Sequence, residues 1–282
     1  MTKQMYKLRN LFFLTIVSVL AINLIIYNAS ASSQNNQIAY DINDRYFIDE
    51  QLNLSYDITS LGLKIAKLDF EVNFNQAQYF SNTIIETQGI GDFFSSSMWS
   101  FSARGVLKSN DIQPKFYNNH IETKQGVGHV SIVYKNDKQN ILTRPVISEE
   151  KYKALMDNID NQVLDPISTL LEISMYHPDD ICTGYWEITD GRRIFSVELN
   201  KVNIDDSKIC YATYKPLIGF TDKEMEKYRD KPTPPFQINF IKITLKNKYT
   251  FLIPTNISIT EGASGSIDLT SLNINGEFVN LN

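Results

Sequence analysis

Apolar and polar residues alternate along most of the chain, and this pattern constrains the fold more than any other feature of the sequence. In the clearest run, polar residues separate Leu52, Leu54, Tyr56 and Ile58. Successive side chains of a strand point to opposite faces, so a period of two gives one buried and one solvated face. The pattern therefore predicts antiparallel strands.

About a dozen such runs are present, and most are bounded by turn residues. After the first, they cover 65–74, 79–88, 99–108, 115–124, 128–135, 140–146, 186–188, 194–197, 209–215, 236–246, 249–259 and 266–279. Twisted open sheets of that size are rare, so the sheet must curl or split into packed layers. We predict a mainly β fold, with a large curved antiparallel sheet or an incomplete β-barrel.

Two short helices are predicted where the alternation breaks. The first covers 149–158, after Ser148 as N-cap. The second covers 166–176, because Asp165 is a favourable N-cap and Pro166 suits the first helical position. A lone Asp at this place is alternatively a general acid or base, but the adjacent proline favours capping.

Two polar segments are interpreted as connections. Asp190-Gly191 predicts a two-residue hairpin turn, followed by an exposed pair, Arg192 and Arg193. The alternative is that one of the two is buried against Asp190 or Glu198. The charged stretch 221–230 is predicted to be a loop.

The first 31 residues have the three parts of a secretory signal peptide. Three basic residues precede a largely apolar run at 11–27, and Ala29-Ser30-Ala31 is a small-residue cleavage site. The apolar run is about as long as a short spanning helix, so an uncleaved membrane anchor is the alternative. Because Asn23 interrupts the run, we expect cleavage near Ala31.

Cleavage divides the chain into a signal peptide at 1–31, a polar leader at 32–51 and a single β-rich domain at 52–282. No later apolar stretch approaches spanning length. We therefore expect a mature protein without a transmembrane segment, in the periplasm or otherwise exported.

Cys182 and Cys210 are the only cysteines in the chain. An even count in an exported protein favours a disulfide between them. A catalytic thiol needs a histidine partner and a metal site needs further ligands, and neither is present nearby in the sequence.

Charge excludes one class of partner. Lys and Arg number 27 against 32 Asp and Glu, which gives a net charge of −5. An acidic chain without long basic runs lacks the electrostatic surface that nucleic acid requires.

The sequence contains no phosphate loop, dinucleotide fingerprint, nucleophile elbow or zinc-protease motif. Its three histidines are His120, His129 and His177. The first two fall on neighbouring predicted strands, but two histidines are a weak basis for a metal site. We predict no catalytic residue, metal ligand or cofactor.

The segment 93–101 is the most unusual, because it sets bulky side chains among serines. Phe93, Phe94, Met98, Trp99 and Phe101 are the candidate ligand-binding residues, as a lip over an apolar cavity. The alternative is ordinary core filling at a short helix or bulge. We favour the cavity because this composition is poorly suited to a regular strand.

A longer pattern runs from Asp165 to Phe220. It combines Asp165-Pro166-Ile167-Ser168, Cys182, Thr189-Asp190-Gly191-Arg192-Arg193, Cys210 and Tyr214-Lys215-Pro216-Leu217-Ile218-Gly219-Phe220. This order resembles the domain of unknown function 3108 family of exported bacterial proteins, as does the Leu54-Ser55-Tyr56 strand followed by Gly62 and Ala66. The resemblance implies a β-rich exported fold similar to periplasmic lipoprotein carriers, and no catalytic residues.

Three functional hypotheses follow. The first is a non-enzymatic binding or envelope-maintenance protein, with an apolar or lipid ligand, or an envelope protein partner, on the concave face of the sheet. The second is an envelope hydrolase assembled from scattered carboxylates and histidines. The third is a structural module that pairs at a sheet edge.

Overall fold

The computed structural model describes residues 49–281, except for 76, 95, 109–110, 125, 136–137, 161, 176–181, 202–208, 231, 247–248 and 260–264. The predicted signal peptide at 1–31 and most of the predicted leader at 32–51 lie outside the described residues.

One antiparallel sheet of 14 strands dominates the described chain, as the alternation predicted. Thirteen of the strands lie side by side in the order β7-β6-β5-β4-β3-β2-β1-β13-β12-β11-β10-β9-β8, and β14 pairs with β13. The strands are β1 (Glu50–Ser60), β2 (Leu63–Asn75), β3 (Gln78–Thr87), β4 (Ser97–Lys108), β5 (Asp111–Thr123), β6 (Gly126–Lys135), β7 (Lys138–Arg144), β8 (Gly184–Thr189), β9 (Ile194–Lys201), β10 (Ile209–Ile218), β11 (Phe236–Thr244), β12 (Thr250–Ile259), β13 (Gly265–Ile274) and β14 (Glu277–Phe278).

Register places the alternating apolar residues on one face. In β1 the buried positions are every second residue, and Leu52, Leu54 and Tyr56 pair across to Val72, Phe70 and Leu68 of β2. The strand begins at Glu50, so the last two residues of the predicted leader belong to the sheet. Glu50 pairs with Phe74 and is buried, which extends the ladder beyond the apolar run.

Four helices are present in the described chain, two more than predicted: α2 (Ile90–Phe94), α3 (Glu149–Asn158), α4 (Pro166–Met175) and α5 (Asp222–Asp230). Those expected at 149–158 and 166–176 are α3 and α4. Ser148 caps α3 as predicted, since its side chain accepts a hydrogen bond from the Lys151 amide.

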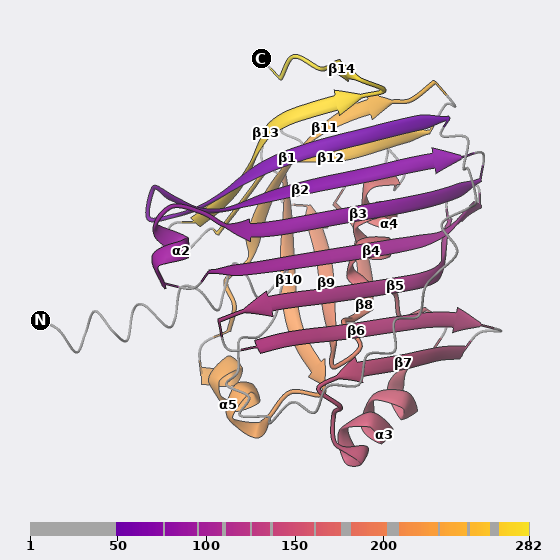
Figure 1. Cartoon of the computed structure of the whole chain (residues 1–282), viewed down its shortest axis with the longest axis vertical. Helices are drawn as coiled ribbons and strands as arrows, with labels where there is room; N and C mark the ends of the chain where they lie inside the picture. Colours follow the sequence, from indigo (N-terminus) through magenta and orange to yellow (C-terminus); the bar gives the residue numbers. More distant parts are fainter. Residues whose placement is uncertain are drawn as a thin grey trace, which may run out of the picture.

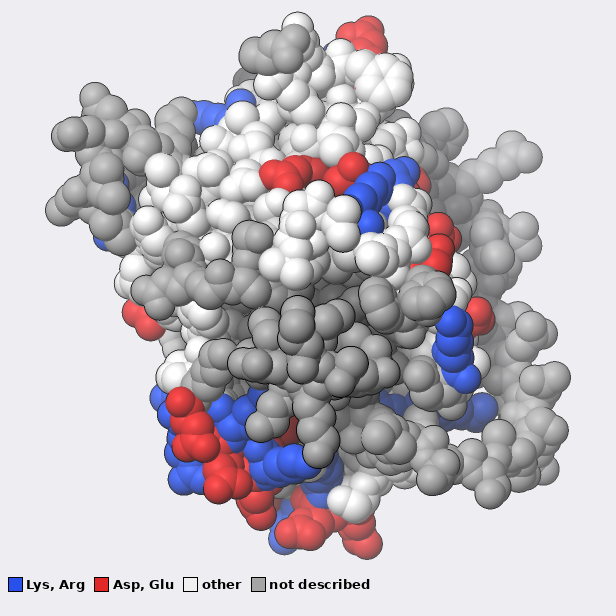
Figure 2. Space-filling model, turned by 90° about the vertical axis from the view of Figure 1, so that its left-hand side faces the viewer, with Lys and Arg blue, Asp and Glu red and all other residues white. Residues whose placement is uncertain are grey.

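Helix α5 corrects the predicted loop at 221–230. The Glu224 side chain accepts from the Thr221 amide at 2.7 Å, and the Thr221 hydroxyl accepts from the Glu224 amide at 3.3 Å. This reciprocal pair is a capping box, which starts a helix even where the following residues are charged. Figure 2 shows acidic and basic side chains gathered at the lower end of that view, the end at which Figure 1 places α5.

The sheet curls around helix α4. Strands β1–β7 form the layer toward the viewer in Figure 1, and β8–β10 lie behind it. Helix α4 packs against β4 and β5 of the first part and against β8 and β12 of the second. It therefore occupies the interior of the curve.

The sheet ends at β7 on one side and at β8 on the other, and these two strands do not pair with each other. The short segment Val163-Leu164 bridges the gap between them. Leu164 forms an isolated parallel bridge with Ile188 of β8. On the other side, the Gln139 side chain of β7 donates to the Val163 carbonyl at 2.7 Å. The architecture is therefore an incomplete barrel with a bridged gap.

The predicted disulfide is present. Cys182, just before β8, is bonded to Cys210 of β10, with 4.9 Å between their Cα atoms. Strand β9 lies between β8 and β10 in the sheet, so the bond ties together two strands that are not neighbours.

The turn after β8 is longer than predicted. Thr189 pairs with Ile194, which leaves four residues in the connection, and Gly191 has a φ of 81°. Arg193 is buried, 8% exposed, and its Nη2 lies 3.1 Å from Glu224 of α5. The predicted exposed arginine pair is therefore wrong. Arg193 is buried because α5 supplies an acidic partner that the predicted loop did not place, and Arg192 is half-buried and donates to the Pro145 carbonyl at 2.9 Å.

Candidate functional site

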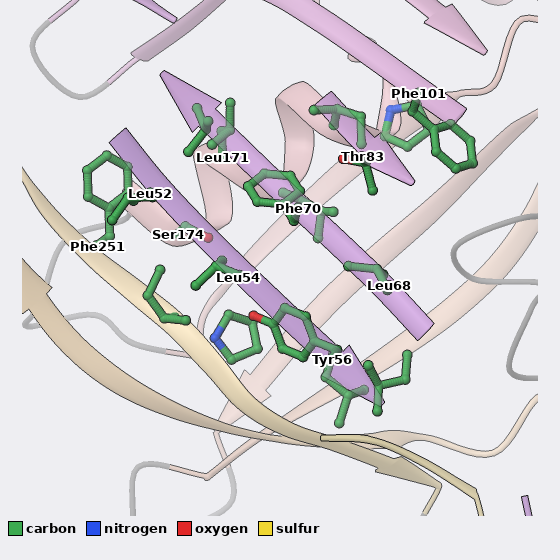
Figure 3. Close-up of a pocket in the computed structure, with 18 of the residues that line it drawn as sticks. Leu52, Leu54, Tyr56, Leu68, Phe70, Thr83, Phe101, Leu171, Ser174 and Phe251 are labelled. Carbon is green, nitrogen blue, oxygen red and sulfur yellow. The ribbon is translucent and has the colours of Figure 1, made fainter. Parts of the chain in front are cut away.

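A cavity of about 80 Å³ lies inside the curved sheet, beside α4 (Figure 3). It is lined by 19 residues: Leu52, Leu54 and Tyr56 of β1; Leu68, Phe70 and Val72 of β2; Thr83 and Ile85 of β3; Phe101 of β4; Pro166, Ile167, Leu170, Leu171 and Ser174 of α4; Phe251, Ile253, Pro254 and Ile257 of β12; and Ile267 of β13. Pockets for whole drug-sized ligands measure roughly 300–1,000 Å³. This cavity therefore suits a short apolar segment of a molecule.

The wall formed by the first four strands follows from their register. Leu54 pairs with Phe70, Phe70 with Thr83, and Thr83 with Phe101, so one row of lining residues crosses four strands. Because residues directly opposite each other lie on the same face, all four side chains point inward.

Helix α4 forms the facing wall. Its lining residues are two adjacent pairs, Pro166-Ile167 and Leu170-Leu171, and Ser174. Residues three or four positions apart lie on the same side of a helix, so this set covers one side of α4. The Asp165 carboxylate accepts from the backbone amides of Ile167 and Ser168 at 3.0 and 2.9 Å. The predicted N-cap is confirmed, and it fixes the start of this wall.

Several lining residues are only half-buried: Phe70, Pro166, Leu170, Ser174, Pro254 and Ile257. Five of these six are apolar, and they come from the sheet and from α4. We regard them as the mouth of the cavity, through which a bound segment would continue to the surface.

Among the described residues, the lining contains no charged side chain. Its polar side chains are the hydroxyls of Tyr56, Thr83 and Ser174. Burial raises the pKa of the Tyr56 phenol, which keeps it neutral. Thr83 Oγ1 is buried without a hydrogen-bond partner in the described structure. A site of this kind holds apolar groups and disfavours ions.

A buried polar cluster adjoins the cavity at the start of α4. Ser168 Oγ donates to the Asp165 carboxylate at 2.6 Å, the Tyr134 hydroxyl donates to it at 3.2 Å, and Tyr79 shares a 2.7 Å hydrogen bond with Ser168. Burial raises the pKa of Asp165 to about 6, against the lowering effect of these hydrogen bonds. Every oxygen of this carboxylate is engaged in holding the helix, which is consistent with the capping role.

The predicted ligand-binding residues are separated by the structure. Phe101 lines the cavity. Trp99 is buried on the same face of β4, outside the lining, and Met98 is half-buried on the opposite face. The side chains of Phe93 and Phe94 lie outside the described residues. The expectation that this segment is unsuited to a regular strand is wrong from Ser97 onward, because burial alternates along it: Ser97, Trp99 and Phe101 are buried, whereas Met98 and Ser100 are half-buried.

Most of the lining was missed by the sequence analysis. The inward positions of β1 and β2 carry a signal, since they are the apolar members of the two clearest alternating runs. Helix α4 offers a second signal in the face that carries Ile167, Leu170 and Leu171. Neither signal distinguishes residues around a cavity from residues in a filled core.

His120 and His129 lie on neighbouring strands, as predicted. The rings of His120 and His129, which pair across β5 and β6, lie 6.5 Å apart between centroids. His120 Nε2 lies 3.0 Å from a Glu122 oxygen. Among the described residues no group of three or more His, Cys, Asp or Glu side chains is arranged to hold a metal ion. In the same part of the chain, no helix is both long and apolar enough to cross a membrane.

Comparison with known proteins identifies no family. No protein-family model matches the chain, and no curated protein matches it. A search of solved structures finds a β-barrel-like protein of domain of unknown function 1849 from Brucella abortus, with 13% identity and a TM-score of 0.44. The match covers 80% of this chain and 98% of the other.

Proposed function

We propose that this protein is an exported, non-enzymatic binding protein of the cell envelope, which holds the apolar segment of a lipid-like molecule inside its curved sheet. The observation that carries the proposal is the cavity lining, in which none of the 19 described residues has a charged side chain. A concave surface of this composition favours apolar groups by roughly 25 cal/mol per Å² removed from water.

The size and the mouth of the cavity support an acyl chain as the bound segment. A cavity of about 80 Å³ accommodates only part of a lipid. The half-buried apolar residues at the mouth, such as Leu170 and Pro254, would contact the part of the chain that emerges. A polar headgroup would then stay in water, where its hydration is retained.

Export is supported by two features. The N-terminal sequence has the pattern of a cleavable signal peptide. The Cys182–Cys210 disulfide is of a kind that persists in oxidising compartments and is rare in the cytosol.

Fluorescence of N-octyl dansylamide, a neutral dye with an alkyl tail, tests the proposal. We expect saturable binding with a blue-shifted emission, because the tail enters the cavity and the dye lies at the mouth. Leu170→Trp should abolish binding by filling the mouth. Leu142→Trp is the matched control, since Leu142 is 62% exposed on β7 and outside the lining. Absence of saturable binding to the wild type would refute the proposal.

A further inference from the structure

We infer that the cavity selects apolar segments that carry one neutral hydrogen-bonding group, such as a hydroxyl or a carbonyl, and that Thr83 is the residue that recognises this group. This inference rests on the proposed function and adds the chemical class of the ligand.

The first observation is the unsatisfied hydroxyl of Thr83. The residue is 4% exposed, it lines the cavity, and its Oγ1 has no hydrogen-bond partner in the described structure. Buried polar atoms are nearly always hydrogen-bonded, and a buried hydroxyl left without a partner is unfavourable. The other buried hydroxyls on the inner face of β3 do have partners: Tyr79 shares a hydrogen bond with Ser168, Ser81 donates to the Glu71 carbonyl, and Thr87 donates to Asp92.

The second observation is the position of Thr83 between two aromatic residues. It pairs with Phe70 of β2 on one side and with Phe101 of β4 on the other, and both line the cavity. Figure 3 shows Thr83 between them. An apolar segment that contacts these rings would bring a hydroxyl or carbonyl oxygen along its length within reach of Oγ1.

The group has to be neutral. The part of the lining that the structure describes supplies no charged side chain to pair with a carboxylate or an ammonium. Burying an unpaired charge is far more unfavourable than burying a hydroxyl. The Thr83 hydroxyl can donate to a carbonyl and can either donate to or accept from a hydroxyl. A segment that supplies such a partner is favoured over a plain hydrocarbon of the same length.

The test measures how strongly 1-octanol and n-octane displace N-octyl dansylamide from the protein. The ratio of the two affinities is compared between the wild type and three variants. We expect the ratio of the two affinities to fall by roughly three- to tenfold in Thr83→Val relative to the wild type, which is the effect of one neutral hydrogen bond. Because valine has the same shape, binding of n-octane should be retained.

Two other variants serve as controls. Ser174→Ala removes a half-buried hydroxyl at the mouth, which water can solvate, and should leave the ratio unchanged. Tyr56→Phe removes the third hydroxyl of the lining and tests whether that group, rather than Thr83, recognises the ligand.

An unchanged ratio in Thr83→Val would overturn the inference, as would a fall confined to Tyr56→Phe. Because n-octane still reports on the cavity itself, these results would leave the proposed function standing, whereas a wild type that binds no dye would refute both.

Discussion

At the scale of single residues, Asp165 has two roles that are in tension. Its carboxylate caps α4, yet it is fully buried, and burial raises its pKa from 3.8 to about 6. A raised pKa means that the folded protein holds this proton more tightly than the unfolded chain does. The stabilisation from this group is therefore complete below about pH 4 and is lost as the pH rises through about 6.

Asp165→Asn removes this ionisation and retains a side-chain oxygen at the cap. We expect the free energy of unfolding of the wild type to fall relative to the variant by about 2 kcal/mol between pH 4 and pH 7, since most of the pKa difference, at 1.36 kcal/mol for each unit, is spanned in this range. Urea titrations across this range measure the difference. Parallel pH profiles for the two proteins would show that Asp165 does not titrate in this way.

Alanine substitutions at Trp99 and Phe101 should have similar effects on stability but different effects on dye binding. Both are buried on the inner face of β4, but only Phe101 lines the cavity. Replacing either with Ala should cost about 3–5 kcal/mol of stability, the usual cost of deleting a buried large aromatic side chain. We expect dye affinity to change in Phe101→Ala and to be retained in Trp99→Ala. Loss of binding in a folded Trp99→Ala protein would contradict the assigned lining.

At the scale of elements, α5 is attached to the β8–β9 turn through Arg193. Its guanidinium lies 3.1 Å from Glu224 and 4.9 Å from the centre of the Phe220 ring. Removing one partner of a buried ion pair leaves the charge of the other uncompensated, which typically lowers the free energy of unfolding by about 3–5 kcal/mol. Since Glu224 keeps some solvent contact, we expect Arg193→Met to cost about 3 kcal/mol.

Arg144→Met is the control for this prediction, because Arg144 is exposed at the end of β7. Thermal or urea unfolding should show little change in that variant. Equal stability of the two variants would mean that the Arg193 contacts contribute nothing to holding α5.

The elements could be predicted from sequence to different degrees. Long strands such as β1 and β3 were predictable because alternation is a local property of the chain. Helix α5 was missed although the Thr221–Glu224 capping box is visible in the sequence, since its charged residues resemble a loop. The burial of Arg193 depends on the docking of that helix, and no local pattern reports it.

At the scale of the whole molecule, the curved sheet with α4 inside it was predictable only in outline. The number of strands requires a curved or layered sheet, but the bridging of β7 and β8 by the segment around Leu164 depends on single hydrogen bonds far apart in sequence. The cavity is harder still to predict, because its lining comes from seven elements brought together by register. Of the three predicted ligand-binding residues whose side chains the structure describes, only Phe101 lies in it.

The most direct test of a lipid-binding role is the mass of the protein as it leaves the cell envelope. Native mass spectrometry of the wild type isolated from envelope fractions should show an added mass, which organic extraction removes. Leu170→Trp, which fills the mouth of the cavity, should lack this mass, and Leu142→Trp should retain it. A wild-type protein that carries no added mass, or a Leu170→Trp protein that carries the same one, would contradict the account.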